Sequence, residues 1–128
     1  MKDLYRHFYK MDAIERATVL FREAHDSIDH KRKYSGEPYW KHTEAVAAIV
    51  QSVVDVKTPL GENMVIAALG HDFLEDVVPV NKDYSLEFLI THFNATIINM
   101  IVQLTDVYTK EAFPSLNRKT RKKKEIER

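Results

Sequence analysis

One helix-length segment of this chain carries four ionisable side chains inside an apolar run, and this combination restricts how the chain can fold. The segment is Glu62–Val78, and its polar residues are His71, Asp72, Glu75 and Asp76. Charged groups are unstable in apolar surroundings unless they are paired or bound to a metal ion. Residues four apart lie one turn apart on an α-helix. We therefore predict that all four side chains project from one side of a single helix.

Two interpretations of this polar face are open. In the first, the His-Asp pair binds a divalent metal ion, and the two later carboxylates handle a water molecule on that ion. In the second, the four residues form the solvated face of an ordinary amphipathic helix. A metal site normally has three or more protein ligands, so the first interpretation needs a donor from another helix. His42 is the best placed imidazole, and His25 is a minor candidate.

Helical periodicity extends over almost the whole chain. The expected helices span residues 12–25, 39–54, 62–78, 85–93 and 95–104, and the part of 111–128 after Pro114. Asp12, with Glu15 three residues later, predicts the start of the first helix, and Ser85 is a suitable N-cap for the fourth. The polar segment 26–38 is expected to be mostly loop, and Thr58–Gly61 is expected to break the chain. Strand signals are weak, so we predict an all-α fold, a helical bundle.

The composition excludes several classes of protein. A length of 128 residues suits a single domain with one core. No apolar run is long enough to cross a membrane, and the N-terminus does not resemble a signal peptide, so we expect a cytoplasmic protein with no membrane partner. The chain has no cysteine, which excludes thiolate chemistry. Any metal is therefore held by imidazole and carboxylate, which suit Mn, Fe, Mg or Zn.

The basic residues are concentrated at one end of the chain. Residues 115–128 hold seven of the 19 Lys and Arg residues and two of the 19 acids, although the formal net charge of the chain is zero. Such a segment can attract the phosphates of a nucleotide or of nucleic acid, but it is more often a solvated helix face. It contains no aromatic residue on which bases could stack. We therefore do not expect nucleic acid to bind.

The loop before His42 combines cations, a glycine and aromatic rings in the segment RKYSGEPY. Arg32 can bind a phosphate with two hydrogen bonds or stack on a base, and Lys33 adds a second positive charge. Tyr39 either stacks on a nucleobase or packs internally. The alternative is a surface loop with incidental charge.

Taken together, RKYSGEPYWKH and AALGHDFLED resemble the motifs of HD-domain phosphohydrolases. More narrowly, they resemble the (p)ppGpp hydrolase domain of RelA/SpoT-type enzymes and small alarmone hydrolases, whose pattern reads roughly RK-x-x-G-x-PY-x-x-H and then AALLHD-x-x-ED. The chain departs from this pattern at Gly70, where the family has an apolar residue. Residues 104–106 and the basic run after Pro114 also look like the family's next region. The resemblance thus covers nearly the whole chain.

This resemblance implies a metal-dependent hydrolase that removes the 3′-pyrophosphate from guanosine tetraphosphate or pentaphosphate. The implied residues are the metal ligands His42, His71 and Asp72, the catalytic residues Glu75 and Asp76, and the substrate-binding residues Arg32, Lys33 and Tyr39. The implied cofactor is a divalent metal ion, typically Mn²⁺, and the implied partner is a guanine nucleotide. Self-association into a homo-oligomer is left open.

The chain also lacks one element of the family pattern. By the same resemblance, a fourth metal ligand is an Asp in a later helix, in a pattern like ADxxxN, and no such pattern occurs between Lys110 and Arg128. Asp106 is the nearest Asp that might replace it. We therefore expect residues 1–128 to form one HD-type hydrolase domain lacking its C-terminal helices. Two alternatives stay open: an HD phosphohydrolase of another nucleotide, and a nucleotide-binding module with weak or no catalysis.

Overall fold

The fold is built from helices. The structure, a computed structural model, describes residues 11–105, 115 and 117–127. Its elements are α2 (Ala13–Ser27), α3 (Trp40–Val53), α4 (Pro59–Leu69), the π-helix η1 (Phe73–Val77), α5 (Leu86–His92), α6 (Ala95–Leu104) and α7 (Arg118–Glu127). Within these residues there is no strand, only an isolated bridge between Lys31 and Pro38. The prediction of an all-α fold is therefore confirmed. No helix in the described ranges is long and apolar enough to span a bilayer.

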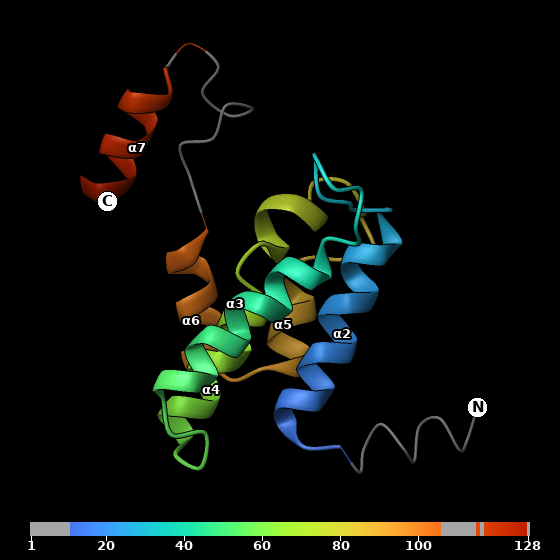
Figure 1. The fold of residues 1–128 in the computed structure, drawn as a ribbon, viewed down its shortest axis with the longest axis vertical. Coiled ribbons are helices and arrows are strands. Elements are labelled where there is room, and N and C mark those ends of the chain that lie inside the picture. Colours follow the sequence, from blue (N-terminus) through green and yellow to red (C-terminus); the bar gives the residue numbers. More distant parts are fainter. Residues whose placement is uncertain (1–10, 106–114, 116, 128) are drawn as a thin grey trace.

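Helix α4 is the element around which the other helices pack (Figure 1). It contacts α2, α3 and α6, and its residues 65–69 are all buried. A helix that is apolar on every side is one that other elements surround. The aromatic ring of Phe21 from α2 and that of Phe73 from η1 meet edge to face beside it, with centroids 5.7 Å apart. The core of the described bundle is thus centred on α4.

Short polar side chains begin several of these helices. Asp12 Oδ1 accepts a hydrogen bond from Glu15 N at 2.8 Å, which confirms the predicted start of α2. Asn94 Oδ1 accepts one from Ile97 N at 2.9 Å in the same way, at the start of α6. Ser85 lies at the N-cap of α5 as predicted, but its side chain makes no capping hydrogen bond. Each bond satisfies a backbone donor that the first helical turn leaves unpaired.

A break separates the second and third helices as predicted, but its bounds differ from Thr58–Gly61, since it covers residues 54–58. Pro59 is the first residue of α4, and Thr58 is its N-cap, with Thr58 Oγ1 accepting a hydrogen bond from Gly61 N at 3.0 Å. Proline is compatible with this position because the first helical residue has no intrahelical use for its N–H group. The same residues that interrupt a helix interior therefore begin this one.

The prediction of one continuous helix over Glu62–Val78 is wrong. Helix α4 ends at Leu69, and the chain turns before the π-helix η1 begins at Phe73. Gly70 is the C-cap residue. A Cβ atom on Gly70 would lie 2.5 Å from Phe21 Cζ and 2.9 Å from Ile101 Cδ1, closer than real side-chain contacts. The backbone therefore passes directly against two core side chains, and His71 and Asp72 lie in a turn instead of on a helix face.

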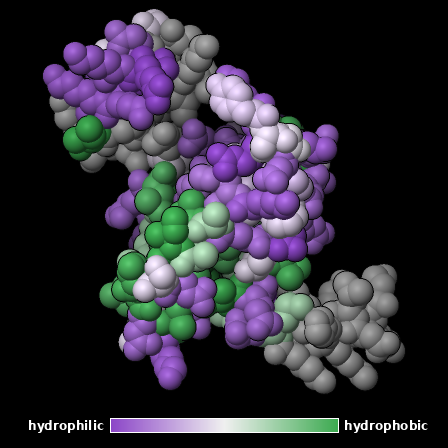
Figure 2. Space-filling model, viewed as in Figure 1, coloured by the Kyte–Doolittle hydropathy of each residue, from purple (hydrophilic) through white to green (hydrophobic). Residues whose placement is uncertain are grey.

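Apolar side chains gather on one face of the bundle, over α3, α4 and α6 (Figure 2). A groove of about 410 Å³ runs there, and it is lined by Val46, Val50, Met64, Ala67, Ala68, Met100, Gln103 and Leu104. Beside it, Ile49 is 67% and Val53 is 78% exposed. The described residues therefore cover the apolar sides of α3 and α6 only in part.

Substitution of Gly70 should test the close approach of the backbone to the core. We expect Gly70→Ala to lower the free energy of unfolding by about 1–3 kcal/mol, the usual range for added volume in a packed core. Urea unfolding of the metal-free protein measures this change. Ile101→Val removes the Cδ1 atom that the new methyl group would meet. The double variant should therefore be destabilised by less than the sum of the single variants, and strict additivity would contradict this explanation.

Candidate metal centre

Three side chains from two separate segments meet at one end of the bundle. His42 lies in the first turn of α3, and His71 and Asp72 lie in the turn after α4. One ligand atom from each lies within 4.8 Å of the others, and the His42 and His71 ring centroids are 5.8 Å apart. In the part of the chain that the structure describes, they are the one group of three such residues. The structure thus brings together the three residues that the sequence predicted as metal ligands.

The hydrogen bond of His71 to the backbone leaves its other ring nitrogen facing the other candidate ligands. His71 Nδ1 lies 2.7 Å from Ala68 O, and a carbonyl oxygen can only accept, so Nδ1 carries a proton. The opposite nitrogen, Nε2, faces Asp72 Oδ2 at 3.0 Å. A metal-binding imidazole commonly donates its other N–H to a carbonyl in this way. Two imidazoles and a carboxylate are also ligands that divalent first-row metals accept, so the residues present fit a divalent ion.

The pKa values of His71 and Asp72 are shifted in opposite directions by their contact with each other. The hydrogen bond with Asp72 raises the pKa of His71, against the opposing effect of burial. Burial opposes ionisation of Asp72, but hydrogen bonds from His71 and Tyr39 outweigh it, and the pKa of Asp72 lies below its usual value. In the metal-free protein each of the two side chains therefore favours the charged form of the other. A metal ion bound here would compete with a proton for His71 Nε2.

Tyr39 is held against the metal ligands. Its hydroxyl donates a 2.6 Å hydrogen bond to Asp72 Oδ2, and its ring stacks on His30 with centroids 3.8 Å apart and planes 11° apart. Burial raises the pKa of Tyr39 well above its usual value, and the hydrogen bond with Asp72 adds to this effect. The phenol therefore stays protonated and remains a donor. Of the two roles the sequence left open for Tyr39, stacking on a base or packing, the structure shows internal packing on one ring face.

The predicted phosphate-binding cations lie on an exposed loop at the same end of the bundle. Arg32 N donates to Glu37 O at 2.8 Å, and Gly36 turns the loop with φ of 70°, a conformation that favours glycine. Burial lowers the pKa of His42; the negative charge of Asp72 opposes this effect, and the positive charge of Arg32 adds to it. Lys33 Nζ lies 5.5 Å from the ring centroid of Tyr34, which is 93% exposed.

Glu75 and Asp76 lie on η1 and are half-buried. Asp76 N donates to Asp72 O at 2.9 Å, so the turn that carries the ligands continues directly into this element. The negative charges of Asp76 and Glu75 both raise the pKa of Tyr39. The two carboxylates therefore act on the same centre, although they do not share a straight helix with His71. Asp106, the suggested fourth ligand, lies outside the described residues.

Sequence reasoning missed His30. The sequence patterns indicate no role for it, and they make His25 only a minor ligand candidate. In the structure His25 is fully buried on α2, and its Nδ1 lies 2.9 Å from His30 Nδ1. His25 is not part of the group of three candidate ligands. No sequence signal marks His30, because its contacts form only when the loop after it folds back and brings Tyr39 beside it. The hydrogen bond from Tyr39 N to His30 O, at 2.8 Å, closes this loop.

Comparison with known families agrees with this geometry. A family model described as an HD domain matches residues 17–128. The chain therefore belongs to the HD-domain family, and this membership indicates a metal-dependent phosphohydrolase. Comparisons with curated proteins and with solved structures yielded no significant match.

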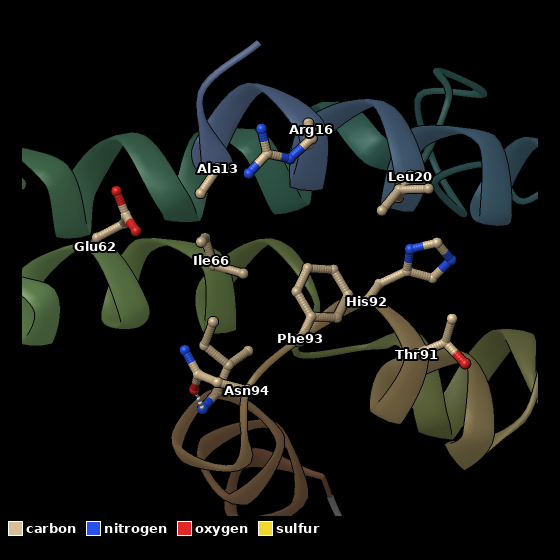
Figure 3. A pocket seen from close by; sticks show the side chains of 10 residues that line it. Ala13, Arg16, Leu20, Glu62, Ile66, Thr91, His92, Phe93 and Asn94 are labelled. Carbon is tan, nitrogen blue, oxygen red and sulfur yellow. Dashed lines mark hydrogen bonds between the residues drawn. The ribbon is translucent and has the colours of Figure 1, made fainter. Parts of the chain in front are cut away.

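A cavity lies elsewhere in the bundle, between α2, α4 and the residues that join α5 to α6 (Figure 3). Its volume is about 400 Å³, and it is lined by Ala13, Arg16, Leu20, Glu62, Ile66, Thr91, His92, Phe93, Asn94 and Ile97. None of the candidate metal ligands lines it. Arg16 and Glu62 place opposite charges on its wall. The cavity is therefore separate from the candidate metal centre.

Burial of His25 should make the stability of the metal-free protein depend on pH. Burial, with the nearby His30, lowers the pKa of His25 from 6.5 to about 4. Between these values the unfolded chain binds a proton that the folded chain does not, so stability falls as the pH falls. The full loss attributable to His25 is on the order of 3 kcal/mol, because one pKa unit corresponds to about 1.4 kcal/mol. Urea unfolding at a series of pH values measures it.

His25→Gln provides the control for the other groups that titrate in the same range. Gln has no titrating ring, so the variant should lose less stability than the wild type over the same pH window. Equal losses in both proteins would show that His25 is not the source.

Proposed function

We propose that this chain is a metal-dependent hydrolase that removes pyrophosphate from guanosine tetraphosphate or pentaphosphate, with Mn²⁺ as its ion. The observation that carries the proposal is the convergence of His42, His71 and Asp72 within 4.8 Å of one another. Arg32, whose positive charge contributes to the low pKa of His42, offers a cation that can bind phosphate. Membership of the HD-domain family supports the reaction class.

Each group has a separate task in the proposed reaction. His42, His71 and Asp72 would hold the ion, and the chemistry that such an ion supplies is a lower pKa for water and a polarised phosphoryl oxygen. Glu75 or Asp76 accepts the proton of the attacking water. The bond between the ribose 3′-oxygen and phosphorus breaks, the water oxygen joins the released pyrophosphate, and the 3′-oxygen gains a proton.

The exposed loop supports a nucleotide substrate. Arg32 and Lys33 offer two positive charges, and both residues are exposed. Tyr34 adds an aromatic face that is 93% exposed, whereas the Tyr39 ring is stacked on His30. Base stacking on an aromatic face is effective but tolerant of base identity. We therefore assign phosphate binding to Arg32 and Lys33. We assign base stacking to Tyr34, and we keep Tyr39 as a substrate-binding residue.

Asp72→Asn should abolish both metal binding and turnover. The substitution removes the carboxylate charge but keeps the shape of the side chain. We expect metal affinity to fall by more than about 100-fold, since even residues that only support a ligand contribute 10–100-fold. Mn²⁺ titration by calorimetry and release of pyrophosphate from ppGpp measure the two effects. Asp83→Asn, at an exposed position, is the matched control and should leave both unchanged.

The outcomes of this experiment separate the alternatives. Full activity of Asp72→Asn would overturn the assignment of the site. Tight nucleotide binding by the wild type, without metal or turnover, would instead favour a nucleotide-binding module.

Arg32→Ala should weaken substrate binding more than it slows the chemical step. Because Arg32 is expected to bind phosphate and not the reacting water, we predict a KM for ppGpp about tenfold higher with a smaller change in kcat. Lys57→Ala is the control, since Lys57 is also exposed but lies between α3 and α4 at the other end of both helices. Steady-state kinetics on ppGpp, dNTPs and nucleoside monophosphates measure both. A preference for 5′-phosphates would contradict guanosine tetraphosphate as the substrate and favour an HD-domain hydrolase of another nucleotide.

A further inference from the structure

We propose that His25 fixes the tautomer of His30, so that His30 directs an Nε2–H group at Asp76 and acts as a positioning residue for that carboxylate. The role of Asp76 in handling water rests on the proposed function. The tautomer itself follows from contacts in the metal-free protein and does not depend on that function. Neither histidine is among the candidate metal ligands.

The contact between the two rings allows two arrangements. His25 Nδ1 lies 2.9 Å from His30 Nδ1, a hydrogen-bond distance. When both rings are neutral, one Nδ1 carries the hydrogen and the other accepts it. In each neutral ring, Nε2 carries a hydrogen when Nδ1 does not, and lacks one when Nδ1 has it. Which ring donates in the shared hydrogen bond therefore decides which of the two Nε2 atoms carries a hydrogen.

The buried end of the pair favours one arrangement. His25 Nε2 is buried and, within the described residues, has no hydrogen-bond partner. If His30 donated, His25 Nε2 would carry an N–H group with nothing to accept it. Buried N–H groups without a partner are rarer in proteins than acceptors with an unused lone pair. The hydrogen of the shared bond therefore belongs to His25 Nδ1. The low pKa of His25 agrees with a neutral ring.

The other end of the pair favours the same arrangement. His30 Nε2 lies 4.0 Å from Asp76 Oδ2. A negative carboxylate at this distance stabilises an N–H group that points toward it and repels a lone pair. With His30 Nδ1 accepting from His25, the hydrogen of His30 lies on Nε2. Both ends thus select one tautomer pair without any group changing its charge.

His30 also connects Asp76 with the metal ligands. Its ring stacks on Tyr39, whose hydroxyl holds Asp72. The backbone fixes this stack on both sides, since His30 N donates to His25 O at 3.1 Å and Tyr39 N donates to His30 O at 2.8 Å. One neutral imidazole therefore contacts the tyrosine that orients a ligand and faces the carboxylate proposed to accept a proton. Supporting contacts of this kind tune metal sites.

Nitrogen-15 NMR of the imidazole rings in the metal-free wild type tests the tautomer directly. Two-bond ¹⁵N–¹H correlations should show His30 protonated at Nε2 and bare at Nδ1, with His25 protonated at Nδ1. The opposite pattern, or rapid averaging between tautomers at His30, would overturn the proposal. This measurement needs no substrate and no metal, so its failure is distinguishable from failure of the proposed function.

A matched pair of variants tests the consequence. His30→Gln can place an amide N–H near the position of Nε2, whereas His30→Asn is too short to do so and keeps a polar group only near Nδ1. Both variants lose the ring that stacks on Tyr39, so this loss cancels in the comparison. In the proposed reaction, kcat should be at least about tenfold lower for His30→Asn than for His30→Gln, with KM within about twofold.

Equal kcat values in the two variants would overturn the positioning role. Thermal unfolding with and without Mn²⁺ shows whether both variants fold and load alike. If neither variant folds, the wild-type NMR spectrum still decides the tautomer on which the proposal depends.

Discussion

The contact of Gly70 with Phe21 and Ile101 is the constraint on which the candidate centre depends. Helix α4 ends at Leu69, and at the next residue, Gly70, the backbone lies closer to these two side chains than any Cβ would permit. A helix that continued would have placed the next side chains at fixed intervals around its axis. The turn after α4 instead directs His71 and Asp72 toward the first turn of α3, and the packing of Gly70 against the core holds the start of that turn.

Hydrogen bonding makes that polar site stable before any ion binds. Asp72 is partly buried, and burial alone would disfavour its charged form. Tyr39 donates to it and His71 Nε2 lies 3.0 Å from it, and these contacts help to hold the pKa of Asp72 below its usual value. The aromatic stack of Tyr39 on His30 in turn restricts the phenol. The site is therefore organised by the protein in advance, which reduces the reorganisation that metal binding requires.

Sequence patterns predicted those parts of the fold that depend on local chemistry. The expected helix 95–104 has the observed bounds, and Asp12 caps α2 because a short side chain and a free N–H group lie three residues apart. Motif spacing also selected His42, His71 and Asp72, which the structure places together. The prediction of a continuous helix over Glu62–Val78 was wrong because apolar residues continue on both sides of Gly70, so periodicity does not mark the C-cap there. The predicted break was placed too late in the chain, at Thr58–Gly61, because proline interrupts a helix interior but is compatible with the first helical residue.

The sequence by itself determined the helical class and the HD-domain family, and it limited any metal ligands to imidazole and carboxylate. Periodicity and motif spacing are patterns among residues close together in the chain, and the lack of cysteine is a matter of composition alone. Only the tertiary structure decided that Tyr39 holds Asp72, 33 residues away, and that His30 lies between His25, Tyr39 and Asp76. These contacts form because the loop between α2 and α3 folds back on itself and η1 packs beside α2. Such pairings depend on the relative positions of whole elements, which are fixed by close packing of the core and not by any local preference.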